Sequence, residues 1–228
     1  MPYCFKDNYG RQSTNLFAEN WKIFPLGDTA VINIRGIHYS NHKPTNRIFR
    51  REEYPDIDTY KAEIEGYAED INKQGYNVYL NLNPIKTDYI GRAAGDADID
   101  YRDLLFIDID RAESAREPAT ESELKASLEL GRKVAAWLSE QGWPSPIKTC
   151  SGNGCHLYYV LDHLENNDAD GALIKGLLGA LAAKFDTAET KIDPVVHNAG
   201  RITKFLGTIA RKGEDSPERP YRVARIVE

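Results

Sequence analysis

A short apolar segment that ends in two aspartates constrains the fold of this chain more than any other feature. Residues 104–107 are Leu-Leu-Phe-Ile, and Asp108 and Asp110 follow on either side of Ile109. An apolar run of this length predicts a buried strand. In a strand, residues i and i+2 point to the same face and lie roughly 7 Å apart, so both carboxylates can reach one pair of divalent cations. The segment is therefore predicted to carry a metal site.

The segments after residue 100 follow a regular order of strands and helices. One helix is predicted between the capping box of Thr120 and Glu123 and the stop at Gly142, and a second over residues 168–185. Strands are predicted over 101–110, 147–150 and 156–161, and the segments 201–206 and 221–227 also look extended. This β-α-β-β-α-β order is the split βαβ of ferredoxin-like and RNA-recognition folds. Its helices cover one face of the sheet and leave the other open.

The first hundred residues mix strand and helix signals. A strand is predicted over 31–37, and a helix over 58–75 because its apolar residues recur at helical spacing before Gly75. Residues 76–82 alternate, which predicts a strand with Tyr79 and Asn81 on its polar face. Residues 86–100 are predicted to form a loop.

Composition indicates an ordinary globular protein. The 228 residues are 41% apolar and 28% charged, with a net charge of -6. A chain of this length can bury a full core as one domain of two lobes or as two small domains. No stretch reaches the ~18 to 20 apolar residues of a membrane span, and the polar first residues lack the apolar core of a signal peptide. We therefore expect a cytoplasmic protein without a membrane partner.

Cysteine spacing and local charge narrow the ligand classes. The three cysteines, Cys4, Cys150 and Cys155, form no even framework and no second C-x-x-C-like pair, so no zinc site is expected. Residues 199–228 hold seven basic and four acidic residues. This segment predicts a local basic stripe on a protein whose net charge is negative. The alternative is that these basic residues only line a solvated edge of a sheet.

The predicted topology brings separate polar segments into one candidate site. The first strand of a split βαβ sheet is central and has a strand of the middle hairpin beside it, so Asp108, Asp110 and His156 are expected to be neighbours on the open face. The turn 151–154, Ser-Gly-Asn-Gly, has few side chains, which lets a backbone approach a phosphate. Asp193 supplies a third acid. Arg201, Lys204 and Thr208 follow it, so we expect the acids to hold metals and the cations a triphosphate.

Each of these residues also has a purely structural interpretation. An Asp-x-Asp pair occurs in loops and at helix caps, and a histidine at the start of a strand is often a core residue. Asp193 could cap the turn made by Pro194. Arg201 and Lys204 could be surface charges, and Tyr79 could simply lie on the solvated side of its strand. The order and spacing of all of them on one sheet favour the functional interpretation.

Three segments together resemble the archaeo-eukaryotic primase superfamily. They are Phe-Ile-Asp-Ile-Asp at 106–110, Ser-Gly-Asn-Gly-Cys-His-Leu-Tyr-Tyr at 151–159, and the stretch 193–208 that begins Asp-Pro-Val-Val-His-Asn. Within that superfamily the chain is similar to the primase-polymerase branch of plasmids, phages and other mobile elements. The resemblance covers about residues 76–225, and residues 210–222 are similar to the segment that follows the third motif.

The resemblance implies an α+β catalytic core of two parts with the active site between them. Residues 1–100 would form an N-terminal α/β lobe, and residues 101–228 an RNA-recognition-like, ferredoxin-like catalytic lobe. The implied activity is that of a DNA primase or DNA-directed polymerase, a nucleotidyltransferase that uses dNTPs or NTPs on a single-stranded DNA template. A helicase or a C-terminal helical domain is an expected partner, and replication of a mobile element is the expected role.

The same resemblance implies roles for individual residues. Two Mg2+ or Mn2+ ions would be held by Asp108, Asp110 and Asp193. The incoming nucleotide would be lined by Ser151, Asn153, Gly154, His156, Arg201, Lys204, Thr208 and Lys212. The initiating nucleotide or the template would meet Arg35, Tyr79, Asn81, Arg219 and Arg222. The basic C-terminal stripe would contact template phosphates, so binding is expected to weaken with salt.

Other classes of protein remain as alternatives. A metal-dependent phosphatase of the haloacid-dehalogenase type has a similar aspartate pair, but it has Thr or Val where this chain has Arg111, and it needs a parallel sheet. A relaxase or nuclease would use a histidine pair, whereas His156 and His163 are seven apart and fall on opposite faces of a strand. A non-catalytic nucleic-acid-binding module would be expected to carry aromatic residues on its sheet face instead of acids.

Overall fold

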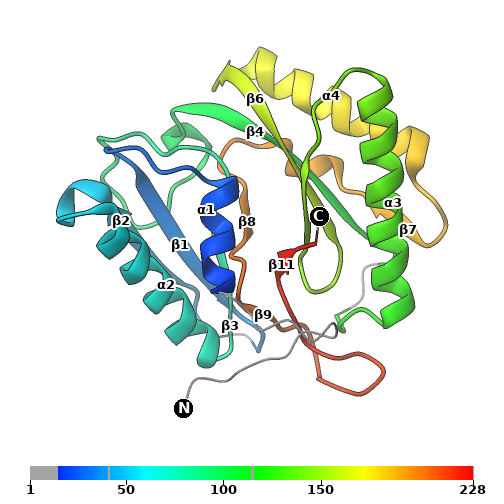
Figure 1. The fold of residues 1–228 in the computed structure, drawn as a ribbon, viewed down its shortest axis with the longest axis horizontal. Coiled ribbons are helices and arrows are strands. Elements are labelled where there is room, and N and C mark those ends of the chain that lie inside the picture. Colours follow the sequence, from blue (N-terminus) through cyan, green and yellow to red (C-terminus); the bar gives the residue numbers. More distant parts are fainter. Residues whose placement is uncertain (1–14, 41, 114–115, 228) are drawn as a thin grey trace.

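Two antiparallel sheets stand side by side in the computed structural model of the chain (Figure 1). It describes residues 15–40, 42–113 and 116–227, and Cys4 lies outside these ranges. The first sheet has the strand order β2-β1-β3-β8, and the second has the order β11-β5-β6-β4-β7. Helix α2 lies along the first sheet, whereas α3 and α4 lie on the outer side of the second (Figure 1). This mixed architecture confirms the α+β prediction.

The N-terminal part of the chain supplies three of the four strands of the first sheet. Its elements are η1 (Leu16–Glu19), α1 (Asn20–Ile23), β1 (Val31–His38), β2 (Thr45–Arg50), η2 (Arg51–Glu53), α2 (Ile57–Lys73), β3 (Tyr76–Asn81) and η3 (Asp96–Asp98). Helix α2 starts where the Asp56 carboxylate accepts the Thr59 N–H, and it is followed by Gly75 with φ 96°. Its predicted apolar face is buried against β1 and β3. Residues 86–100 form the expected loop, apart from η3.

The second sheet has the predicted split βαβ order. Its elements are β4 (Tyr101–Arg111), α3 (Glu121–Glu140), β5 (Ile147–Cys150), β6 (Cys155–Glu165), α4 (Asp168–Phe185) and β7 (Thr190–Ile192), followed by η4 (Pro194–His197). Helix α3 begins at the predicted capping box, in which Thr120 and Glu123 each bond the other's backbone N–H. Strand β4 is an interior strand of this sheet, between β6 and the edge strand β7.

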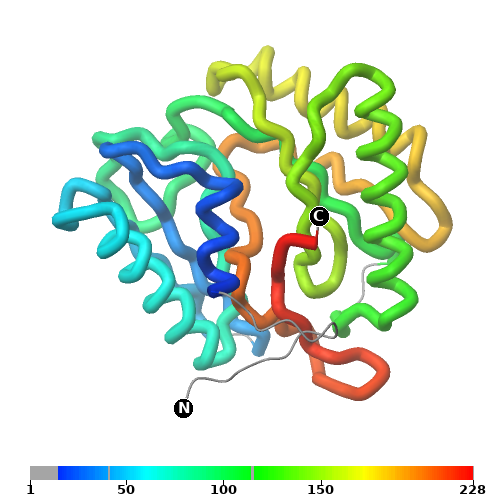
Figure 2. The backbone as a smooth tube through the Cα atoms, viewed as in Figure 1, coloured from blue at the N-terminus to red at the C-terminus, as the bar shows by residue number. Residues whose placement is uncertain are grey.

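The segment after β7 differs from the prediction. Residues 201–206 were expected to be extended, and β8 (Ile202–Lys204) is, but it pairs with β3 and so belongs to the first sheet. The chain then forms β9 (Ile209–Ala210) and β10 (Arg222–Val223), and β11 (Arg225–Ile226) returns to the edge of the second sheet beside β5. Figure 2 shows this late segment crossing between the lobes. The final strand of the split βαβ is β7, which is too short to show a sequence alternation.

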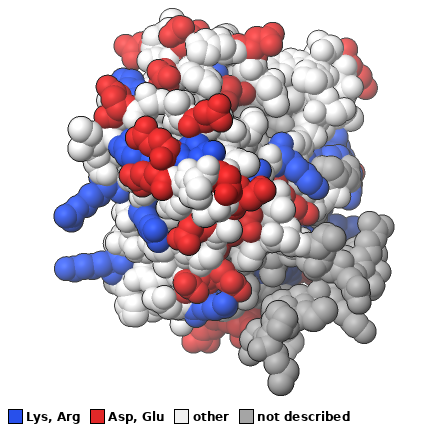
Figure 3. Space-filling model, turned by 60° about the vertical axis from the view of Figure 1, so that its left-hand side comes forward, with Lys and Arg blue, Asp and Glu red and all other residues white. Residues whose placement is uncertain are grey.

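The surface has no uniformly basic face in the view that brings the first lobe forward. Figure 3 shows Lys and Arg side chains mixed with Asp and Glu side chains there. No helix within the described ranges is long and apolar enough to cross a membrane. On this face, attraction for a polyanion would come from local arrangements of cations.

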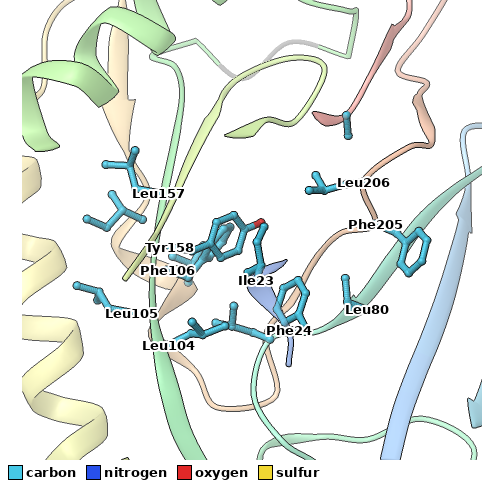
Figure 4. Close-up of a cluster of buried hydrophobic side chains, with 14 of the residues drawn as sticks. Ile23, Phe24, Leu80, Leu104, Leu105, Phe106, Leu157, Tyr158, Phe205 and Leu206 are labelled. Atoms are coloured by element: carbon cyan, nitrogen blue, oxygen red, sulfur yellow. The ribbon is translucent and has the colours of Figure 1, made fainter. Parts of the chain in front are cut away.

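The two faces of β4 have different environments. Leu105, Ile107 and Ile109 are at most 1% exposed and point toward the helices of the second lobe, where Gly131 of α3 approaches Ile109. The opposite face turns toward the first lobe, where Phe106 packs on Tyr158. Figure 4 shows this interface core, with residues of α1, β3 and the segment after β8 beside it. Asp108 and Asp110 lie on this second face, between the lobes.

Candidate active site

A row of polar side chains crosses the second sheet at Asp108. The register of β4 and β6 places His156 directly opposite Asp108, and His156 Nε2 lies 3.3 Å from Asp108 Oδ1. On the other side, the Asp193 N–H donates to the Asp108 carbonyl at 2.9 Å, which extends the β4–β7 pairing by one residue. Residues directly opposite each other in antiparallel strands point to the same face. His156, Asp108 and Asp193 therefore form one row across the sheet, which we call the acid row.

Asp110 lies on the same face as Asp108, two residues along β4. A Cβ at Gly154 would collide with the Asp110 carboxylate and the Ile109 carbonyl, so only glycine lets the turn after β5 approach this strand. Burial raises the pKa of Asp110, and the neighbouring Asp108 raises it further. The two carboxylates thus repel each other in a poorly solvated place.

This acid pair has the properties of a cation site that is completed by a ligand. Asp108 Oδ1 is buried and lies 3.3 Å from His156 Nε2, but it accepts no hydrogen bond of good geometry from the described residues. The raised pKa of Asp110 marks a charge that a cation would relieve. Among the described residues, no three acidic, histidine or cysteine side chains converge into a closed metal cluster. Mg2+ is usually held by one or two carboxylates together with substrate phosphates. The residues present fit such a half-open site.

Asp193 has a structural role as well. Its Oδ1 accepts the Val195 N–H at 2.9 Å and caps η4, as the alternative interpretation of this residue expected. Its backbone stays in the acid row. A third metal ligand from Asp193 would therefore need the carboxylate to turn away from Val195.

His156 connects the two lobes. It is buried, and its Nδ1 lies 3.2 Å from the Tyr158 hydroxyl. That hydroxyl lies 2.6 Å from Thr203 Oγ1 in β8. Because Thr203 precedes Lys204, one hydrogen-bonded path runs from the acid row to the strand that carries the first lobe's buried lysine.

A second row, of opposite character, lies on the first sheet. The registers place Arg35 opposite Tyr79 and Tyr79 opposite Lys204, so the three side chains share one face. Lys204 Nζ donates to Asn77 Oδ1 at 2.8 Å and lies 4.6 Å from the centre of the Tyr79 ring. Burial lowers the pKa of Lys204 to about 7, and the nearby charge of Arg211 contributes to the shift.

The two rows are within electrostatic reach of each other. Burial raises the pKa of Tyr79 to about 12, and Asp108 and Asp110 add to the rise. Lys212 acts in the opposite direction on Asp110, since its charge lowers the pKa of that carboxyl. Lys204 and Lys212 form no ion pair with a carboxylate of the described residues. Lys212 is thus a cation without an ion pair near the crowded carboxylates, and Lys204 is connected to them through Tyr79.

The glycine turn is held by its own hydrogen bonds. Ser151 Oγ accepts the Gly154 N–H at 2.9 Å, and the Ser151 N–H donates to the Gly154 carbonyl at 3.0 Å. Asn153 Oδ1 accepts the Ala119 N–H at 2.8 Å, so this amide is tied to the start of α3. Gly152 has φ 98°, which a residue with a side chain rarely adopts. The turn borders Asp110 without an intervening side chain.

Several predicted residues are occupied elsewhere in the structure. Thr208 is buried and donates to the Phe205 carbonyl, and Arg201 donates to the Val195 carbonyl. Asn81 is buried, with its Oδ1 accepting the Asn33 N–H and its Nδ2 donating to the Asn83 carbonyl. These three side chains hold the backbone around the site, and their contact with a ligand stays a prediction.

Arg219 and Arg222 also hold structure together. Arg219 pairs with Glu117 at 3.2 Å and with Glu123 at 2.9 Å, and Arg222 pairs with Glu121 at 3.1 Å. Burial alone would raise the pKa of Glu123, but its bond from the Thr120 N–H and the nearby guanidinium groups lower it to about 2. The two arginines thus fasten the C-terminal segment to the start of α3 and do not reach the acid row.

The structure adds residues that the sequence did not single out. Asn77 accepts from Lys204 and from the Arg211 N–H, and its own amide donates to the Arg211 carbonyl. Tyr158 and Thr203 link the lobes. The alternation of β3 places Asn77 on the polar face with Tyr79, which was the one available signal. The other contacts depend on β8 joining the first sheet.

Comparisons by sequence gave no match: no protein-family model and no curated protein matches the chain. Comparisons by structure did. The chain is similar to the crystal structure of primase RepB′, with 12% identity and a TM-score of 0.50. The match covers 93% of this chain and 55% of the RepB′ chain, so the chain spans little more than half of that primase.

Two further structures contain nucleic acid. The catalytic domain of RepB′ in complex with initiator DNA is 12% identical, with 91% of this chain and 81% of that chain covered and a TM-score of 0.51. The polymerase domain of Mycobacterium tuberculosis ligase D in complex with DNA is 15% identical, with 91% and 78% covered and a TM-score of 0.51. These neighbours share the fold of this chain over most of its length, which confirms the predicted α+β class.

Proposed function

We propose that this protein is a template-dependent nucleotidyltransferase, a DNA primase or polymerase that joins dNTPs or NTPs on a single-stranded DNA template. Replication of a mobile element is the proposed setting, and a helicase or a separate helical domain the proposed partner. The observation that carries the proposal is that the crowded pair Asp108 and Asp110 lies within electrostatic reach of the polar row of the first sheet. The two aspartates act on Tyr79, and the buried Lys204 lies over the Tyr79 ring.

The repulsion between the two carboxylates is unfavourable, and so is the burial of the charge of Lys204. The substrate of a polymerase would relieve both. A divalent ion fits between the carboxylates, and the triphosphate that the ion carries fits the cations. Two Mg2+ or Mn2+ ions would be held by Asp108 and Asp110, with Asp193 as the proposed third ligand. When bound, the ions would supply activation of the attacking hydroxyl and charge neutralisation at the leaving pyrophosphate.

The side chains of this chain mainly position and neutralise. His156 is oriented by Tyr158 and lies beside Asp108, where it can donate to a phosphate oxygen. Lys204 and Lys212 lie where negative charge of the polyphosphate would collect. The turn 151–154 allows the nucleotide close to Asp110 because Gly154 has no side chain. Phosphoryl transfer needs little further acid–base chemistry.

The test is a synthesis assay on a single-stranded template. Wild type and the Asp108→Ala plus Asp110→Ala double variant are incubated with labelled dNTPs or NTPs and Mn2+, with and without a primer. We expect wild type to extend the primer or to make dinucleotides, and the double variant to do neither while it still binds DNA. If wild type makes no product under any of these conditions and both proteins bind DNA identically, the chain is a binding module and not a polymerase.

A further inference from the structure

Three aromatic rings stack at the end of β1. His38 lies between Tyr39 and His42, with ring centroids 4.9 Å and 3.9 Å away and interplanar angles of 27° and 16°. We call Tyr39, His38 and His42 the ring stack. Tyr39 is 49% exposed and His42 is also exposed, so both ends of the stack face solvent. Exposed rings in parallel order offer π-faces to other planar groups.

The ring stack is anchored from one side only. His38 Nδ1 accepts the Ser40 N–H at 3.1 Å, its Nε2 lies 3.1 Å from the Gln74 carbonyl, and Tyr76 packs edge-on against its ring. The central ring is thereby fixed. Nothing comparable among the described contacts holds the outer faces of Tyr39 and His42.

Strand β3 connects the ring stack to the candidate active site. Tyr76 packs on His38. The next residue, Asn77, forms hydrogen bonds with Lys204 and Arg211. The charges of the two aspartates raise the pKa of Tyr79. The register places His38 opposite Tyr76, on the face of the first sheet that packs against α2, whereas Asn77 and Tyr79 point to the other face. The ring stack therefore lies at the end of the sheet, and it approaches the polar face through Tyr39, the residue after His38.

Positive charge lines the same path. Arg211 is bound to Asn77 and is followed by Lys212, which acts on Asp110. Burial lowers the pKa of Arg211, and the hydroxyls of Tyr221 and Tyr39 partly offset this, so Tyr39 lies close to that guanidinium. Arg211 Nη1 is buried and has no hydrogen-bond partner among the described residues. A cation with an unused donor thus lies beside Tyr39 of the ring stack.

We propose that the ring stack holds an unpaired base of a single-stranded nucleic acid next to the active site, with Arg211 on the adjoining phosphate. Stacking rings combined with cations are the means by which proteins hold single strands without reading their sequence. The inference rests on the proposed function, because it takes the strand to be the template that enters the acid pair. It adds Tyr39 and His42 to the residues proposed to bind the strand. Binding through phosphate contacts alone would not require these two rings.

The alternative is that the ring stack only closes the turn between β1 and β2. In that case its loss would lower thermal stability and leave nucleic-acid binding as it was. The two interpretations therefore differ in whether the bases of the strand matter. A strand without bases keeps the phosphates and cannot stack.

The experiment compares two probes of equal length by fluorescence anisotropy, an oligodeoxythymidylate and an oligonucleotide whose central residues are abasic. For wild type, the normal strand should bind at least about fivefold more tightly, the smallest effect of one stacked base. The Tyr39→Ala plus His42→Ala variant should bind both probes alike. Tyr39→Phe, which keeps the ring, should behave as wild type.

A matched control removes an exposed ring elsewhere. His163 pairs with Tyr101 at 4.4 Å between centroids, at the far end of β4 and β6, and His163→Ala should keep the wild-type preference for bases. A ring-stack variant that unfolds earlier but keeps that preference would overturn the inference. So would a wild type that binds both probes equally.

The outcome separates the inference from the proposed function. All probes are also measured with the Asp108→Asn plus Asp110→Asn variant, which should keep the base preference without synthesis. One outcome is that wild type makes no product while the Tyr39→Ala plus His42→Ala variant loses the preference for bases that wild type shows. In that case the polymerase proposal fails and the stacking surface stands. If wild type extends primers and the ring-stack variant keeps the preference, the stacking surface alone fails.

Discussion

The two sheets of this molecule differ in the sign of the charge that they turn toward each other. The second sheet presents Asp108 and Asp110, and burial with mutual repulsion raises the pKa of Asp110. The first sheet presents Lys204, whose pKa burial lowers to about 7. The raised pKa of Asp110 and the lowered pKa of Lys204 both disfavour the charged form of the side chain. The carboxylates of the second sheet and the lysine of the first sheet therefore do not fully neutralise each other. The difference indicates a ligand with both signs of charge, such as a divalent ion that carries a polyphosphate.

The acid side should give the largest effect. Asp108→Asn removes a charge that the proposed reaction needs, so nucleotidyl transfer should fall on the order of a thousandfold. The unliganded protein should be no less stable, because the change removes a buried repulsion with Asp110. Steady-state incorporation and thermal unfolding measure the two quantities. A parallel loss of both activity and stability would mean that Asp108 is mainly a structural residue.

The contact between the glycine turn and Asp110 should come next. Gly154→Ala places a Cβ against the Asp110 carboxylate and the Ile109 carbonyl. Displacing the acid by about 1 Å can cost about a hundredfold in rate, and the overpacking about 1 to 3 kcal/mol in unfolding free energy. Urea unfolding and primer extension measure these changes.

Gly176 provides the matched control for that substitution. It lies in α4, and a Cβ there would meet no atom within 4 Å. Gly176→Ala should raise the unfolding free energy by about 0.5 to 1 kcal/mol and leave synthesis unchanged. Equal changes in unfolding free energy and synthesis in the two alanine variants would show that Gly154 has no special role.

The cation side should show a smaller effect with a distinct dependence on pH. Lys204→Met should weaken triphosphate binding about tenfold. In wild type, a bound triphosphate favours charged Lys204, so binding should take up a proton above pH 7 and weaken as pH rises from 7 to 9. Calorimetry in buffers of different ionisation enthalpy measures that proton.

The same lysine affects the stability of the unliganded protein. The fold releases the Lys204 proton near pH 7, whereas the unfolded chain keeps it up to about pH 10.5. The unfolded state therefore binds more protons between these values, and this group makes stability rise with pH there. Lys204→Arg, which stays charged, should show neither the proton uptake nor this rise. A flat pH response in wild type would contradict the assignment.

The link between the two sheets should give the smallest effect. Tyr158→Phe removes the hydroxyl between His156 and Thr203. We expect about a fivefold loss of rate because the histidine loses the partner that orients it. Tyr159→Phe removes a buried hydroxyl of the next residue that has no hydrogen-bond partner among the described residues, and it should keep the wild-type rate. An unchanged rate in Tyr158→Phe would show that the link does not orient His156.

Much of the acid side could be predicted from sequence. The split βαβ order follows from local signals: the capping box at Thr120, apolar periodicity, and the glycine turn at 151–154. The juxtaposition of Asp108 and His156 then follows from the strand order of that fold. In these segments the local signals agree with the global fold, which is why short-range patterns were sufficient.

The cation side could be predicted only in part. Lys204 was a candidate, but its partners depend on a strand of three residues that returns to the first sheet, and such a strand carries no alternation. Arg219 and Arg222 were expected at the template, yet they pair with acids at the start of α3. Long side chains choose among partners that only the tertiary fold supplies. Strand β2 and helix α1 were not predicted, since both are short and irregular in pattern.

Binding of a nucleoside triphosphate tests the central claim most directly. Isothermal titration, with and without Mn2+, would compare wild type, Asp108→Asn plus Asp110→Asn, Lys204→Met, and the combination of all three substitutions. We predict that Mn2+ tightens binding only where the aspartates remain. The losses from the two sides should not add, because one ligand bridges both. Binding that is independent of Mn2+ in wild type, with additive losses, would contradict a site made jointly by the two sheets.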